Sequence, residues 1–85
     1  MPTISRFYGI VIYMYHDEHG IPYFHAKYQD EACVIGLDGK ILEGKFPKKQ
    51  LKIVQVWIFE NYEALILNWE LAQEGEPMIR IAPLE

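Results

Sequence analysis

The sequence is short of cysteine, of positive charge and of long apolar runs. Its 85 residues include a single cysteine, Cys33, so no internal disulfide can form and a disulfide-stapled scaffold is excluded. Twelve acidic residues outnumber eight lysines and arginines, and the net charge of −4 disfavours general nucleic-acid binding, which depends on neutralising phosphates. The apolar run Ile10–Tyr15 is far shorter than the ~20 residues that cross a bilayer. We therefore expect no membrane segment.

The start of the chain shows no secretory signal, since Ser5 and Arg6 interrupt it and no cleavage-like site follows. Together with the lone thiol, this predicts a protein of the reducing cytoplasm. Apolar residues are plentiful: 51% of the chain is hydrophobic and 14% aromatic, which suits one core and a single domain over residues 1–85. This content is high enough to leave some apolar surface uncovered, and such surface favours association.

The most regular pattern is a helical stripe in the second half of the chain. Apolar side chains recur there at steps of three and four residues: Leu51, Val54, Ile58, Tyr62, Leu65, Trp69 and Ala72. Pro47 suits a first helical turn, whereas Gly75 and Pro77 suit a helix end. The range 47–74 therefore predicts one long helix or, because Asn61 is a good N-cap residue, two helices that break near it.

The first half of the chain has the composition and alternation of β-strands. Four stretches show it: residues 4–15, 23–28, 32–37 and 41–45. Gly9 is a candidate bend in the first of them. The pair Asp38–Gly39 predicts a two-residue type I′ hairpin turn, and residues 78–82 predict a short edge strand. The expected fold is α+β: a mostly antiparallel four-stranded β-sheet covered by a long or kinked C-terminal helix, then a short edge strand.

Three segments carry a resemblance to a known family. They are the opening MPTISRFYGI, the loop segment HGIPYFHA from His19 to Ala26, and the ending NWELA followed by GEP. On these segments the whole chain resembles the prokaryotic family four-one-six-zero of domains of unknown function. The family's loop usually reads His-x-Pro-Pro-His-Phe-His-Ala. In this chain Ile21 stands in place of the first proline, and Tyr23 stands in place of the middle histidine.

The resemblance also implies a partner. Members of this family are often encoded beside members of family two-four-four-two, and the pair looks like a toxin–antitoxin module. The chain is then expected to be a protein-association component of a two-gene module, with the product of the neighbouring gene as its partner. Val56 and Leu67 interrupt the charged side of the predicted helix, so we expect them to bind that partner or a second copy of the chain.

An RNA-cleaving toxin is the alternative function. Such a reaction needs an acid, a base and a group that stabilises phosphate charge, and the candidates are Arg6, Tyr8, His25 and Tyr28. Tyrosines could also stack on bases. The same residues equally fit structural roles, since Arg6 could be a charge at the sheet edge. Whether the chain is an enzyme therefore stays open.

A metal-binding domain is the second alternative. His16, His19 and His25 lie close in sequence, but their spacing matches no standard zinc motif, and a tyrosine occupies position 23. His19 and His25 are the only weak candidates, so we expect neither a metal nor any other cofactor. Cys33, Trp57 and Trp69 are expected to be core residues.

Overall fold

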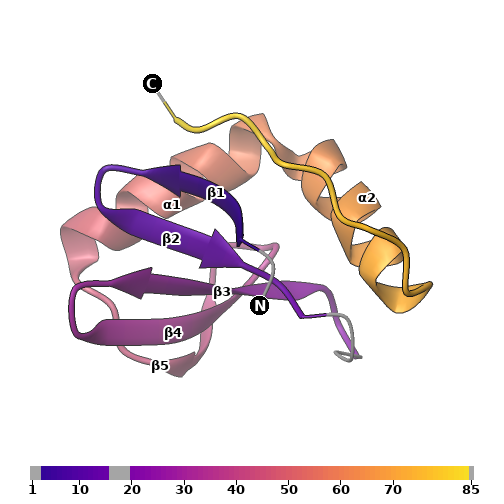
Figure 1. The fold of residues 1–85 in the computed structure, drawn as a ribbon. Helices are drawn as coiled ribbons and strands as arrows, with labels where there is room; N and C mark the ends of the chain where they lie inside the picture. The colour runs from indigo at the N-terminus through magenta and orange to yellow at the C-terminus, as the bar shows by residue number, and fades with distance from the viewer. Residues whose placement is uncertain (1–2, 16–19, 85) are drawn as a thin grey trace.

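The computed structural model describes residues 3–15 and 20–84. Within these residues, five strands precede two helices: β1 (Thr3–Phe7), β2 (Ile10–Tyr13), β3 (Tyr23–Tyr28), β4 (Glu31–Gly36), β5 (Ile41–Gly44), α1 (Lys48–Glu60) and α2 (Tyr62–Gln73). The strands form one sheet in the order β1-β2-β3-β4-β5, and every pair is antiparallel (Figure 1). The predicted α+β class with an antiparallel sheet is therefore confirmed, but the sheet has five strands rather than four.

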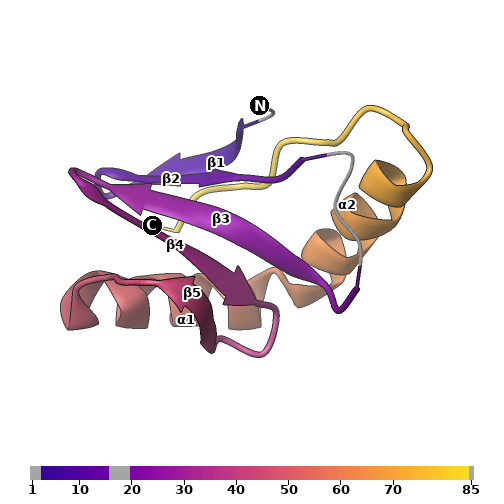
Figure 2. The same ribbon diagram turned by 90° about the horizontal axis from the view of Figure 1, so that it is seen from below.

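The core lies between the sheet and α1. This helix crosses one face of the sheet, while α2 turns away along the end where β2 stops and β3 starts (Figure 2). Trp57 of α1 is fully buried, and its ring centroid lies 5.1 Å from that of Phe7 and 5.9 Å from that of Phe24. Trp69 of α2 is 7% exposed and packs against Tyr23 at 5.1 Å. Both tryptophans are core residues, as expected.

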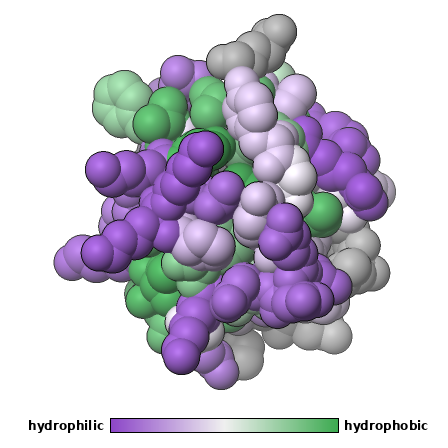
Figure 3. Space-filling model, turned by 90° about the vertical axis from the view of Figure 1, so that its left-hand side faces the viewer, coloured by the Kyte–Doolittle hydropathy of each residue, from purple (hydrophilic) through white to green (hydrophobic). Residues whose placement is uncertain are grey.

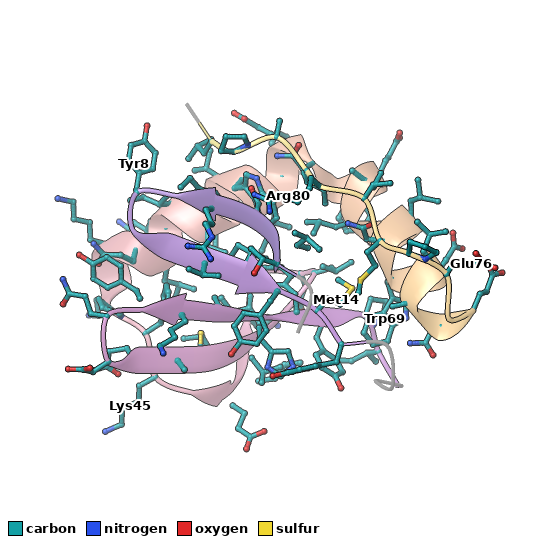
Figure 4. All side chains as sticks on the ribbon, viewed as in Figure 1. Tyr8, Met14, Lys45, Trp69, Glu76 and Arg80 are labelled. Carbon is teal, nitrogen blue, oxygen red and sulfur yellow. The ribbon has the colours of Figure 1, made fainter. Side chains whose placement is uncertain are left out.

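The single strand expected over residues 4–15 is wrong. The chain reverses at Tyr8 and Gly9, whose φ angles of 51° and 78° are both positive, as a two-residue type I′ hairpin requires. Tyr8 projects from this turn away from the body of the molecule (Figure 4). The stretch reads as one apolar run because both strands of the hairpin bury side chains. In addition, an irregular register near the start of β1 buries the adjacent Ile4 and Ser5 together.

The hairpin between β4 and β5 exists, but its turn differs from the expected one. Gly36 N–H donates to the Lys40 carbonyl at 2.9 Å, and Gly39 N–H donates to the Gly36 carbonyl at 2.9 Å. The connection therefore has three residues, with Gly39 at φ 89° and no positive φ at Asp38. The two-residue type I′ prediction at 38–39 is wrong, because the Asp38 carboxylate instead accepts the Lys40 N–H at 3.0 Å and shapes a longer loop.

The helical region is broken, as one of the two alternatives predicted. Asn61 lies between the helices with φ −125° and ψ 24°, and it makes no side-chain cap for α2. Its amide Nδ2 donates instead to the Trp57 carbonyl at 2.9 Å, so the expected N-cap serves the end of α1. The break changes the phase of the stripe, and Tyr62 is consequently 49% exposed rather than buried. The predicted helix ends at Pro47 and Gly75 are confirmed.

Residues 78–84 are not the predicted edge strand but an irregular segment, which we call the C-terminal strap. Ile81 N–H donates to the Ile4 carbonyl at 2.8 Å, and Ser5 Oγ donates to the Ile81 carbonyl at 2.9 Å, so the strap follows β1. Trp57 Nε1 also donates to the Ala82 carbonyl at 2.9 Å. Side chains supply most of these bonds, which is why no regular strand forms. Among the described residues, no helix has the length and apolarity to span a membrane.

Candidate functional site

The sheet face opposite α1 carries a row of side chains in one register. Tyr13, His25, Val34 and Glu43 pair successively across β2, β3, β4 and β5. Because directly paired residues of antiparallel strands point to the same side, all four belong to this open face. A shallow hollow of about 320 Å³ lies among them and includes the edge of Cys33.

His25 is the centre of an aromatic cluster on the open face. Its ring stacks on Tyr13, with centroids 5.1 Å apart and planes inclined by 11°. Tyr15 and Tyr23 approach the same imidazole edge-on, at 4.9 and 6.0 Å. These contacts orient the imidazole by packing, and the nearest charged side chain lining the hollow is the acidic Glu43.

The four candidates for RNA cleavage do not meet at one point. Arg6 pairs with Val11, so it shares the open face with His25, but two strand spacings and two residues put their Cα atoms about 12 Å apart. Tyr8 lies in the β1–β2 turn, and Tyr28 packs its ring against Phe46, 6.4 Å away, on the opposite side of the sheet. The structure therefore shows no acid, base and charge stabiliser assembled from these residues.

Cys33 does not supply a nucleophile in this hollow. The residue is 5% exposed, and burial raises the pKa of its thiol to about 11. At neutral pH the sulfur is therefore protonated. The expected role of Cys33 as a small core residue is confirmed.

The metal-ligand candidates are only partly visible. His16 and His19 lie outside the described residues, whereas His25 lies on β3. Within residues 3–15 and 20–84, no three histidine, cysteine, aspartate or glutamate side chains gather as a ligand set.

The outer side of the two helices carries four exposed large apolar side chains, and Phe59 among them is the most exposed large apolar residue of the described chain. Val56 is 48% exposed and Leu67 is 46% exposed, so both expected partner-binding residues are accessible. The sequence reading missed Phe59, which is 86% exposed, and Tyr62, at 49%. The helical periodicity of α1 could have revealed that Phe59 is exposed. Its neighbour Ile58 points into the core, and the next residue on a helix is rotated by about 100°. We call these four residues the helix outer face.

A groove of about 510 Å³ runs beside Phe59 and Tyr62, between α1 and the β4–β5 turn. Leu37 and Ile58 supply apolar walls, and Gln55 Nε2 donates to the Gly39 carbonyl at 2.9 Å, which ties the turn to the helix. The end of the molecule with the β1–β2 and β3–β4 turns is more hydrophilic than this groove. Hydrophilic side chains cover most of it, with apolar patches between them (Figure 3).

The charges on α1 are separated along its length. Lys48, Lys49 and Lys52 occupy the first half and are exposed, whereas the exposed Glu60 ends the helix. The first turn holds no acidic residue and the last turn holds no basic one. The outer surface of α1 is therefore positive at one end, apolar in the middle and negative at the other end.

Comparison with known proteins adds a family and no further relative. No curated protein and no solved structure shows a significant match to the chain. Residues 9–70 match the profile of a family described as a domain of unknown function, DUF4160, which is the family that the sequence segments resemble. The match covers well over half of the 85 residues, and the chain belongs to this family.

Proposed function

We propose that this chain is a non-catalytic protein-association domain of a two-gene, toxin–antitoxin-like module in the cytoplasm. The partner is the product of the neighbouring gene, which the family resemblance suggests. The observation that carries the proposal is the helix outer face, where four large apolar side chains lie exposed, two on α1 and two on α2.

Phe59 is the strongest element of this argument. An 86% exposed phenylalanine leaves most of its apolar area in water, and burying such a side chain contributes about 1.5–3 kcal/mol. Aromatic residues at the centre of an interface often supply a large share of its binding energy. The groove beside Phe59 adds a concave surface to the protruding ring. A partner could therefore contact both the exposed ring and the groove next to it.

Co-purification tests the proposal. The chain is co-expressed with the tagged product of the gene that neighbours its own, and we expect wild-type chain to be retained by the tag. Phe59→Ser and the double variant Val56→Glu/Leu67→Glu should reduce retention at least tenfold, because they place polar or charged groups in the contact.

Leu42→Glu is the matched control. Leu42 on β5 is 46% exposed, as Leu67 is, but it lies on the sheet rather than on the helices. This variant should be retained like the wild type. Failure of the wild-type chain to co-purify, or equal retention of all the variants, would contradict the proposed function.

A further inference from the structure

The charge order of α1 opposes the dipole of the helix itself. Backbone amides make the N-terminus of a helix partially positive and its carbonyls make the C-terminus partially negative, so acidic residues suit the start and basic ones the end. In α1, Lys48 and Lys49 stand at the start and Glu60 stands at the end. This placement weakens the helix on its own, and the stability of α1 therefore does not explain it.

The charged and apolar residues of α1 form a symmetrical stripe. Lys52, Val56 and Glu60 follow at steps of four residues, and all three are exposed. On an α-helix such steps lie along one side, with Lys52 and Glu60 each about 6 Å along the axis from Val56. Val54, Trp57 and Ile58 are buried on the opposite side. Phe59 flanks the middle of the stripe.

We infer that this stripe binds a second copy of the same chain, with the two α1 helices antiparallel about a two-fold axis at Val56. The reversed copy places each Lys52 opposite the partner's Glu60, and it brings each Phe59 beside the partner's Val56. Such a contact is isologous and closes after two chains. Each α1 dipole is unfavourable to the charges of its own helix. In the pair, the dipoles of the two helices point in opposite directions. This inference goes beyond the proposed function, because it gives part of the helix outer face a second occupant, which competes there with the product of the neighbouring gene.

The size of the stripe sets the strength of the contact. A helix of 13 residues is about 20 Å long, and a standard interface buries about 800 Å² of each partner, which is about one seventh of the chain's 5336 Å² of accessible surface. One helix stripe supplies less than this amount. The dimer should therefore form in a concentration-dependent equilibrium rather than permanently.

Two charge-reversal variants test the antiparallel pairing by sedimentation velocity over a concentration series. Lys52→Glu places Glu against Glu60 at both ends of a homodimer, and Glu60→Lys places Lys52 against Lys at both ends. Each variant alone should raise the dissociation constant about tenfold. In an equimolar mixture of the two, one chain presents only acids and the other only bases, so the mixed dimer should form at least as tightly as the wild type.

Matched controls change the same charges elsewhere. Lys45→Glu and Glu74→Lys alter exposed residues outside α1, and the Lys45 side chain, just after β5, points outward from the molecule (Figure 4). Neither should change the dissociation constant. Phe59→Ser should lower the dimer fraction without altering charge, and circular dichroism confirms that each variant is folded.

The outcomes separate this inference from the proposed function. A wild-type chain that stays monomeric throughout the series, or a mixture that does not recover, overturns the antiparallel dimer. If the product of the neighbouring gene is still retained in either case, the proposed function stands. If the chain neither dimerises nor retains the product of the neighbouring gene, both the antiparallel dimer and the proposed function are wrong.

Discussion

At the scale of single residues, Gly44 is the position where the backbone leaves no room for a side chain. Its φ is 88°, and a Cβ built there would lie 2.5 Å from the Ala32 carbonyl oxygen and 3.0 Å from Cys33 Cα. These are backbone atoms of β4, so relief would require the strand pair to separate. Gly75 has a similar φ of 72°, but a Cβ there would meet nothing within 4 Å.

The two glycines therefore form a matched pair. We expect Gly75→Ala to lower the free energy of unfolding by about 1–2 kcal/mol, the cost of a left-handed backbone at alanine. Gly44→Ala should lower it by about 3 kcal/mol or more, because the clash adds to that cost. Urea denaturation measures both values. Equal losses in the two variants would show that β5 shifts freely at Gly44.

Cys33 makes a prediction about pH. The pKa of its thiol rises from the ordinary 9.0 to about 11 because burial disfavours the thiolate. The folded chain holds this proton more tightly than the unfolded chain does. The stabilising contribution is therefore complete below pH 9 and is lost as the pH rises through 11. Cys33→Ala lacks this contribution. Between pH 9 and about pH 11, the unfolding free energy of the wild type should therefore fall relative to that of the variant.

Thiol labelling gives an independent measurement of the same property. In native buffer at mildly alkaline pH, a disulfide reagent should modify Cys33 only as fast as the chain unfolds, since the thiolate is the nucleophile and the sulfur is buried. A denatured sample is the control and should react at once. Native labelling as rapid as that of the denatured chain would contradict both the burial and the pKa.

At the scale of elements, the C-terminal strap depends on one buried amide of α2. Asn68 is fully buried, its Nδ2 donates to the Ile79 carbonyl at 2.8 Å, and its Oδ1 accepts the Ile79 N–H at 2.9 Å. These two hydrogen bonds satisfy the backbone N–H and carbonyl of Ile79, as a neighbouring strand would satisfy those of an edge strand. Asn68→Ala should lower the unfolding free energy by about 2 kcal/mol and speed hydrogen exchange at the Ile81 amide.

The control for Asn68 is Asn61→Ala. Asn61 gives up a single side-chain bond, to the Trp57 carbonyl, and that bond lies at the helix break rather than at the strap. Asn61→Ala should lower the unfolding free energy by less than Asn68→Ala does, and it should leave hydrogen exchange at the Ile81 amide unchanged. If Asn68→Ala also leaves Ile81 unchanged, the strap is held by β1 and Trp57 alone.

The sequence was informative wherever one local preference decides the structure. Pro47 and Gly75 mark the helix ends, and the alternation of residues 23–28 predicts β3. The sequence misled where a turn uses an unusual residue and where the deciding contact is distant. The β1–β2 turn uses Tyr8 where asparagine or glycine is usual, and the strap is defined by bonds to side chains far away in sequence.

The candidate site divides in the same way. The accessibility of Val56 and Leu67 follows from helical phase, whereas the spread of the four RNA-cleavage candidates follows from strand pairing, which composition does not reveal. Phe59 was missed because a phenylalanine is expected to be buried. The groove beside it, unlike its exposure, can be seen only once α1 is packed on the sheet.

At the scale of the whole molecule, the two ends of the chain complete one core. β1 and the C-terminal strap run side by side (Figure 1), and they bring Ile4, Phe7 and Ile81 into the core that surrounds Trp57. The family match over residues 9–70 includes neither of these segments. The matched range therefore leaves out residues that belong to this core.

A fragment of residues 9–70 should consequently fail to fold cooperatively. It lacks the buried side chains of Ile4, Phe7, Ala72 and Ile81, and Trp57 loses both its closest ring partner and the Ala82 carbonyl that accepts its N–H. The three larger side chains alone contribute about 4.5–9 kcal/mol, which is comparable with the whole stability of a small domain, about 5–15 kcal/mol.

Thermal melts followed by circular dichroism, with amide dispersion in a proton–nitrogen correlation spectrum, measure the outcome. Residues 1–77, which keep β1 and lose only the strap, are the matched control. They should melt cooperatively but at a lower temperature than the full chain, because Phe7 still covers Trp57 while its N–H loses the Ala82 acceptor. A fragment 9–70 that melts as sharply as the full chain would show that the sheet and helices are stable without either end. The joining of the two ends would then be a consequence of the fold rather than one of its causes.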